Sequence, residues 1–164
     1  MSRFRILSAL PALVLFAASA AAGEATSKGS ALLEAPYSGA AAWYQTHRPN
    51  LFKAANAEII ESKEDGRCVL LTKTPLGPCK YLVQETAEIG DAKTVYRVKF
   101  LQSVEGDVAD QTMTVTLSDQ NGSIHVALSL YVKVDNRLAP SFVVKQVTER
   151  SIRQSLKYLK ENAR

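Results

Sequence analysis

Between residues 57 and 134, apolar and polar side chains alternate with the period of two that is typical of half-buried β-strands. The alternation predicts six strands, at residues 57–63, 67–74, 79–87, 94–103, 111–119 and 123–134. Turn residues separate the strands, and Asn121-Gly122 is the strongest hairpin signal among them. Consecutive strands joined by short turns predict an antiparallel meander.

One face of the last two predicted strands is apolar and the other is polar. Met113, Val115 and Leu117 alternate with threonines, and the even-numbered residues from 124 to 134 alternate with residues that include His125 and Lys133. This pattern predicts a sheet with one buried face and one face in contact with water.

A long amphipathic helix is predicted at residues 141–162, which contain neither glycine nor proline and follow Pro140. Its apolar or small residues recur at spacings of three and four, so they share one face, and its basic residues lie largely on the other. The members of the first set are Val144, Val147, Ser151, Ile152, Ser155, Leu156, Tyr158 and Leu159. We expect this helix to cover the apolar face of the sheet.

The residues before the meander predict smaller elements. Residues 23–29 are small and polar, which is typical of a disordered lead-in, and residues 30–34 predict a short first strand. Two short helices follow at about 40–44 and 51–55, because Pro49-Asn50 is expected to interrupt a single helix.

The first 22 residues have the order of a secretory signal peptide: basic residues, an apolar stretch and then small residues. The apolar stretch is shorter than the 20 or so residues that span a membrane, and an uncleaved anchor is the alternative. Ala20 and Ala22 suit cleavage after Ala22, and cleavage after Ala25 is also compatible. We therefore expect export to the periplasm or the medium and one mature domain over residues 30–164.

The charge balance argues against a nucleic-acid partner. The chain has 20 Lys and Arg against 16 Asp and Glu, and loss of Arg3 and Arg5 with the leader leaves 18 against 16. So small an excess of basic residues is typical of an ordinary soluble surface and not of a nucleic-acid-binding surface. The basic residues of the last helix predict a solvated face that complements the helix dipole, with transient contact with a phosphate or membrane surface as the alternative.

Two cysteines, Cys68 and Cys79, flank a Pro- and Gly-containing turn and are expected on neighbouring strands of one hairpin. In an oxidising compartment such a pair predicts a structural disulfide, and free thiols are the alternative. The two histidines, His47 and His125, lack a cysteine or a second histidine at ligand spacing, so we expect no metal site and no cofactor.

Three stretches and the order of elements carry a family resemblance. The stretches are Ala42-Trp43-Tyr44, residues 57–61 followed by Asp65-Gly66-Arg67, and Ala139-Pro140-Ser141-Phe142 leading into residues 156–160. With this order the chain resembles the START-like, or helix-grip, superfamily of polyketide cyclase and lipid-transport type over residues 30–162. The resemblance implies an α+β fold in which a curved antiparallel sheet wraps around a long carboxy-terminal helix, with two short helices after strand 1.

The resemblance also implies a cavity for an apolar ligand between the last helix and the sheet. The residues expected to line it are Tyr96, Val98, Phe100, Met113, Val115, Leu117, Val126, Leu128, Leu130, Val147, Ser151 and Ser155. Ser151 and Ser155 are small enough to leave space for a ligand; alternatively, they let the helix approach the sheet closely. Apolar alternation by itself marks any protein core.

The expected function is that of an exported carrier or sensor for a lipid-like or polycyclic molecule. A small cyclase- or hydrolase-type enzyme and a protein-interaction module with a collapsed cavity are the alternatives. His125 is predicted on the wet face with Arg97 and Lys99, and His47 in a loop, so neither histidine is expected to be catalytic. The direction of Glu85 stays open, since it shares a face with Tyr81 and Val83 at the end of that pattern.

Overall fold

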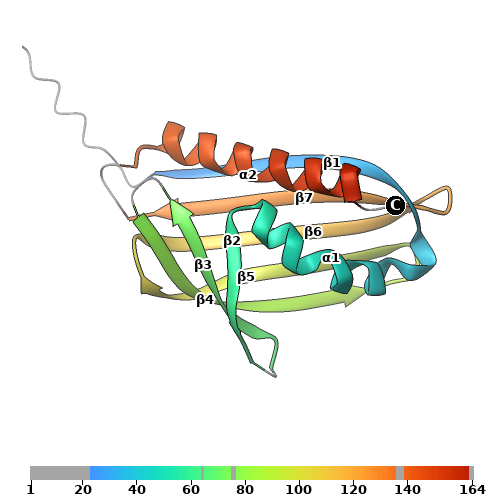
Figure 1. Cartoon of the computed structure of the whole chain (residues 1–164), viewed down its shortest axis with the longest axis horizontal. Helices are drawn as coiled ribbons and strands as arrows, with labels where there is room; N and C mark the ends of the chain where they lie inside the picture. The colour runs from blue at the N-terminus through green and yellow to red at the C-terminus, as the bar shows by residue number, and fades with distance from the viewer. Residues whose placement is uncertain (1–22, 64, 75–76, 136–138, 163–164) are drawn as a thin grey trace, which may run out of the picture.

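The computed structural model describes residues 23–162 except 64, 75–76 and 136–138. Seven strands and two α-helices make up this part of the chain (Figure 1). In chain order the elements are β1 (Glu24–Pro36), the 3-10 turn η1 (Tyr37–Gly39), α1 (Ala40–Ala54), β2 (Ala57–Ser62), β3 (Arg67–Thr74), β4 (Gly77–Ile89), β5 (Lys93–Glu105), β6 (Val108–Gln120), β7 (Ser123–Val134) and α2 (Ser141–Asn162).

All seven strands belong to one antiparallel sheet in the order β1-β7-β6-β5-β4-β3-β2. The six strands predicted from the alternation are therefore confirmed as a meander, and β1 joins it beside β7. Asn121 and Gly122, at φ values of 56° and 85°, form the β6–β7 turn, in which Gln120 pairs with Ser123. The burial of β6 alternates as predicted, with Met113, Val115 and Leu117 buried on the inner face.

Strand β1 begins earlier than the sequence indicated. Residues 24–29, expected in a disordered lead-in, pair with β7 from Glu24 opposite Lys133 onward. Two contacts with α2 hold this part: the Ser27 and Thr148 hydroxyls are 2.7 Å apart, and Gly29 lies directly beneath Leu156. A Cβ atom at Gly29 would come within 2.6 Å of a Leu156 methyl carbon, so glycine permits the close approach.

Helix α1 is one continuous helix, and the prediction of two short helices was wrong. Pro49 lies inside it and removes one backbone hydrogen bond. Side chains on both sides of the proline are buried, Tyr44 before it and Leu51 and Phe52 after it, so packing on the sheet compensates for the lost bond. The helix ends at Ala54, and Asn56, which follows the C-cap residue Ala55, adopts the left-handed conformation at φ 64°.

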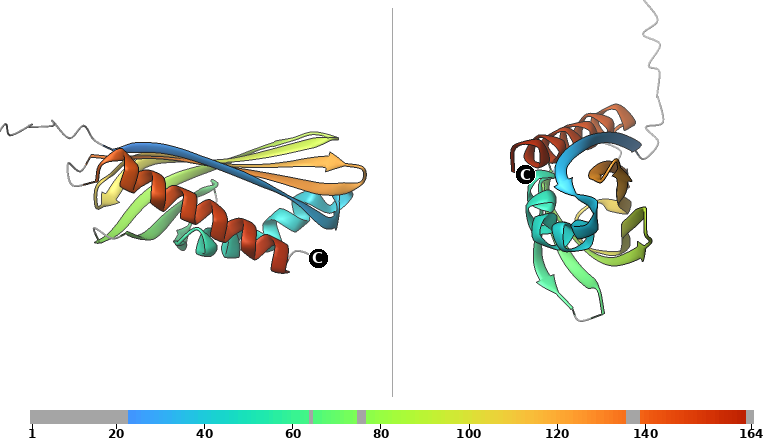
Figure 2. Two further views of the ribbon diagram at one scale, coloured as in Figure 1. Left: turned by 90° about the horizontal axis from the view of Figure 1, so that it is seen from above. Right: turned by 90° about the vertical axis from the view of Figure 1, so that its right-hand side faces the viewer.

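Helix α2 has the predicted bounds and lies beside α1 on the inner face of the sheet (Figure 2). Its buried residues follow the predicted face and include Val144, Ser151, Ile152 and Leu159. Its basic residues Arg150, Arg153, Lys157 and Lys160 are exposed. The core therefore lies between a layer of two helices and one face of the curved sheet.

The predicted disulfide is not formed. Cys68 and Cys79 lie on the neighbouring strands β3 and β4, as expected, but both are buried free thiols. In the register of this hairpin Cys68 pairs with Val83, whereas Cys79 pairs with Thr72. The offset of four residues separates the two cysteines by about 13 Å along the strands, and a disulfide needs Cα atoms within about 7 Å.

Candidate functional site

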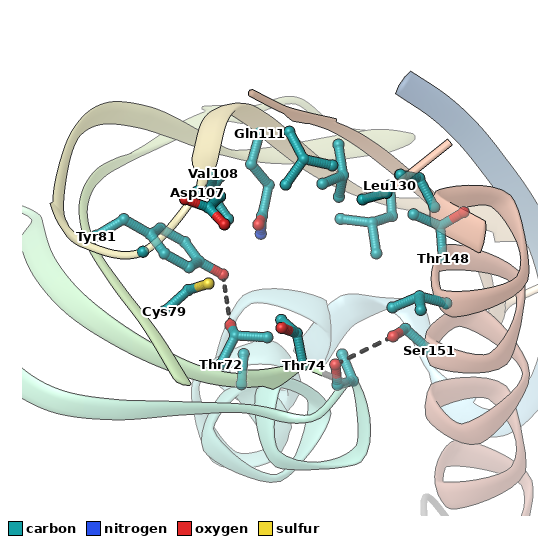
Figure 3. Close-up of a pocket in the computed structure, with 18 of the residues that line it drawn as sticks. Thr72, Thr74, Cys79, Tyr81, Asp107, Val108, Gln111, Leu130, Thr148 and Ser151 are labelled. Atoms are coloured by element: carbon teal, nitrogen blue, oxygen red, sulfur yellow. Dashed lines mark hydrogen bonds between the residues drawn. The ribbon is translucent and has the colours of Figure 1, made fainter. Parts of the chain in front are cut away.

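A cavity of about 150 Å³ lies between the first half of α2 and one end of the sheet (Figure 3). The end of α1 and the β3–β4 hairpin close its other sides. The described residues that line it are Phe52, Ala55, Ala57, Thr72, Thr74, Pro78, Cys79, Tyr81, Gly106, Asp107, Val108, Gln111, Met113, Leu130, Val132, Val134, Ala139, Val143, Val144, Val147, Thr148 and Ser151. Pro78 at the start of β4 and Asp107 in the β5–β6 turn are exposed while Met113 and Leu130 are buried, so the cavity opens on the side of Pro78 and Asp107.

The lining is mostly apolar, and its polar groups are predominantly uncharged. Tyr81 is only 1% exposed, and its hydroxyl lies 2.7 Å from the Thr72 hydroxyl. Burial raises the pKa of Tyr81, and hydrogen bonds from Thr72 and Gln111 oppose part of this shift. Tyr81 is therefore neutral over the physiological pH range.

The residues predicted to line a cavity divide into two groups. Met113, Leu130, Val147 and Ser151 line the observed cavity. The remaining predicted residues face inward but lie elsewhere in the core: Tyr96, Val98, Val115, Leu117, Val126, Leu128 and Ser155 are buried, and Phe100 is partly buried. The sequence indicated the inner face correctly but not the part of that face that stays unfilled.

Helix α1 fills the other end of the inner face. The Tyr44 ring stacks on the Tyr96 ring with centroids 3.7 Å apart and an interplanar angle of 15°. Leu51 is 1% exposed in the same core. Because these side chains occupy the space beside Tyr96, the cavity is limited to the end near the start of α2.

The two small serines of α2 contact α1. Ser151 donates a hydrogen bond to the Ala55 carbonyl at 3.2 Å, and Ser155 donates one to the Leu51 carbonyl at 3.4 Å. Both serines therefore let α2 and α1 approach each other. The sequence had suggested, as the alternative to a ligand cavity, that these serines let the helix approach the sheet. Ser151 also lines the cavity, so its small size serves both purposes.

A charged cluster that the sequence did not predict lies beneath α1. Glu85 on β4 faces inward. Its carboxylate accepts a hydrogen bond of 2.7 Å from the Tyr44 hydroxyl and forms an ion pair with the Arg48 guanidinium at an N–O distance of 2.6 Å. Side-chain exposure is 18% for Arg48 and 14% for Glu85. Burial and the nearby Glu85 carboxylate raise the pKa of Tyr44 strongly, and burial raises that of Cys68, which lies 3.9 Å from the Arg48 guanidinium.

The alternation contained a signal for one member of this cluster. Tyr81 and Val83 are buried on β4. Glu85 lies two residues beyond Val83, so its side chain is on the same face of the strand. Arg48 carried no such signal, because its partner is 37 residues away along the chain and is reached only when α1 packs on the sheet.

Solved structures share this arrangement of sheet and helices. A START superfamily protein from Mycobacterium smegmatis matches with a TM-score of 0.61 and 11% identity, over 83% of this chain and 94% of that protein. A STAR-related lipid transfer protein from Xanthomonas axonopodis matches with a TM-score of 0.57 and 15% identity, over 83% and 84% of the two chains. An aromatase/cyclase from Streptomyces sp. R1128 matches with a TM-score of 0.52 and 10% identity, over 86% and 96%.

The chain has a START-like fold. No protein-family model and no curated protein matches its sequence. At 10–15% identity the likeness of these structures extends to the fold and not to individual site residues.

Neither histidine of this START-like chain lines the cavity. The Nδ1 atom of His47 lies 3.0 Å from the Tyr158 hydroxyl, and its ring centroid is 4.8 Å from that of Trp43. Partial burial lowers the pKa of His47. His125 lies on the outer face of the sheet, where its Nδ1 atom is 3.4 Å from the Ser118 hydroxyl.

Within the described part of the START-like domain, no group of three His, Cys, Asp or Glu side chains is placed to hold a metal ion. The helices of this part are also too short or too polar to cross a membrane.

Proposed function

We propose that the protein is an exported carrier or sensor that binds a hydrophobic small molecule in the cavity between α2 and the sheet. The observation that carries the proposal is the cavity itself, about 150 Å³ of space lined mainly by apolar side chains. A buried apolar surface of this kind favours apolar ligands, because both surfaces leave water on binding.

The size of the cavity limits what it encloses. An apolar cavity of roughly 150 Å³ holds a molecule of about the size of benzene, whereas pockets for drug-sized ligands measure roughly 300–1,000 Å³. The enclosed part of the ligand is therefore about one ring or a short chain. A longer lipid-like or polycyclic ligand extends through the opening beside Asp107, or requires α2 to move.

Two observations favour this function over the alternatives from the sequence. The ionisable side chains among the lining residues are Cys79, Tyr81 and Asp107, and the raised pKa of Tyr81 makes it a poor proton donor or acceptor near neutral pH. The large exposed apolar side chains are distributed over β1, β2, β4, β5 and α2, and only β5 carries two of them, which does not favour a docking module.

Export is supported by the order of basic, apolar and small residues in the first 22 positions. The START-like relatives named above include a lipid transfer protein and an aromatase/cyclase, and the first of these is the functional class nearer to this proposal.

The test is native mass spectrometry of the protein purified from the exported fraction, followed by organic extraction of bound material. The proposal expects a stoichiometric apolar compound on a chain that begins at Gly23. An unliganded mass that does not change after incubation with small apolar compounds would overturn the carrier assignment, and absence of the protein from the exported fraction would overturn export.

A pair of variants tests where the ligand binds. Val147 lines the cavity from α2, so Val147→Phe puts a ring into the space and is expected to weaken binding at least roughly tenfold. Gln146→Phe is the matched control, because Gln146 is exposed on the same helix. Equal binding by both variants would show that the ligand lies elsewhere.

A further inference from the structure

Within the proposed function, on which this inference rests, we infer that the cavity selects an uncharged ligand with one hydrogen-bonding group. The apolar body of the ligand lies towards α2 and β7, and its polar group meets Tyr81, Thr72 and Gln111. The ligand class is therefore a small neutral phenol, alcohol or ketone in preference to a plain hydrocarbon or an acid.

The polar atoms of the cavity are gathered at one end. Figure 3 shows the Tyr81 hydroxyl and the Gln111 side-chain amide directed into the same part of the space from β4 and β6. Thr72 adds a hydroxyl from β3, at 2.7 Å from that of Tyr81. Tyr81 is 1% exposed and Gln111 is 9% exposed, so these groups are shielded from bulk water.

This end keeps hydrogen-bonding capacity after its internal bonds are made. The Tyr81 and Thr72 hydroxyls and the Gln111 amide carry four hydrogens in all, and the hydrogen bonds that Tyr81 makes with Thr72 and with Gln111 use two of them. The other two hydrogens and the remaining lone pairs can serve a ligand that accepts or donates. A hydrogen bond formed here adds to affinity, so a ligand with one polar group is favoured over a plain hydrocarbon.

The opposite wall offers no comparable capacity. The Thr148 hydroxyl is engaged with Ser27 at 2.7 Å and with the Lys145 carbonyl at 3.0 Å. The Ser151 hydroxyl donates to the Ala55 carbonyl. Because the hydroxyls of α2 are satisfied by the protein, this wall presents mainly the apolar surfaces of residues such as Val147 and Leu130 to the ligand.

Burial of the polar end disfavours an anionic ligand. Tyr81 is 1% exposed, and the burial that raises the pKa of its hydroxyl would equally disfavour a carboxylate placed beside it. A neutral ligand avoids this penalty.

Three one-ring probes separate shape, hydrogen bonding and charge: benzene, phenol and benzoate. Their dissociation constants are measured by calorimetry or NMR titration on the mature protein at neutral pH. Phenol is expected to bind roughly five- to tenfold more tightly than benzene, as one net hydrogen bond allows. Benzoate is expected to bind at least roughly tenfold more weakly than phenol.

Tyr81→Phe removes the hydroxyl and keeps the ring, so it should bring the dissociation constant for phenol to within about twofold of that for benzene. Tyr131→Phe is the matched control, because the Tyr131 hydroxyl contacts Glu24 on the exterior and should leave the preference intact. Thr72→Val should reduce the preference for phenol over benzene in the same way. Thr72 is less buried than Tyr81, so this variant provides the test if Tyr81→Phe does not fold.

The outcomes separate this inference from the proposed function. If wild-type protein binds benzene and phenol equally, or if Tyr81→Phe and Thr72→Val keep the phenol preference, the polar end does not select the ligand and the inference fails. If none of the probes binds wild-type protein, the proposed function itself fails.

Discussion

The ion pair between Arg48 and Glu85 allows a quantitative prediction about how α1 is held on the sheet. Its N–O distance is 2.6 Å, and both side chains are more than four-fifths buried. Replacement of Glu85 by Gln keeps the shape of the side chain and its capacity to accept from Tyr44, but it leaves the Arg48 charge without its counter-charge. Arg48 Nε already has no hydrogen-bond partner within the described residues, so the guanidinium has little other compensation.

The expected cost follows from the burial of the pair. Removing one partner of a fully buried ion pair costs about 3–5 kcal/mol. Since some exposure remains, we expect Glu85→Gln to lower the free energy of unfolding by about 3 kcal/mol, or roughly 10 °C in melting temperature for a domain of this size. The double variant Arg48→Met/Glu85→Gln removes both charges and should cost less than the sum of the single variants by about 2 kcal/mol.

Urea unfolding followed by circular dichroism measures these differences, with the slope of each transition checked for constancy. Glu105→Gln is the matched control, because Glu105 pairs with Lys80 at 2.9 Å on the surface and should cost less than about 1 kcal/mol. If Glu85→Gln costs no more than Glu105→Gln, or if the single variants are additive in the double variant, water screens the Arg48–Glu85 pair and the reasoning is refuted.

Two further predictions concern His47 and the cysteines. Burial lowers the pKa of His47 below its ordinary value of 6.5 in the folded chain, so its contribution to stability is present above pH 6.5 and is lost as the pH falls towards the folded-state pKa. The free energy of unfolding of wild-type protein should therefore fall more between pH 7 and pH 5 than that of His47→Gln, and parallel curves would contradict this. Because the β3–β4 register separates Cys68 from Cys79, both should react with a thiol reagent in denaturant without prior reduction; labelling that requires reduction would show a disulfide.

The elements with a strong local period could be predicted from the sequence. The alternation in β6 and β7 and the three-to-four spacing in α2 depend on which face of a single element is buried, and neighbouring residues alone encode that choice. The hairpin at Asn121-Gly122 belongs to the same class, because its conformation follows from two residues. These features fixed the order of elements, which together with the three stretches quoted above carried the resemblance to the START-like fold.

Tertiary packing decided the remaining features, because each depends on residues far apart in the chain. Strand β1 starts at Glu24 because β7 pairs with it and α2 lies over Gly29. Helix α1 continues through Pro49 because the sheet buries side chains on both sides of the proline.

The position of the cavity is also a consequence of long-range packing. Most residues of the inner face carry the same apolar signal, but Tyr44 of α1 covers Tyr96, while the space near Tyr81 and Val147 stays unfilled. In the elements with a clear period, the sequence by itself determined which residues face inward. The docking of α1 determined which of them contact other protein atoms and which are left for a ligand, since local periodicity carries no information about the space between two elements.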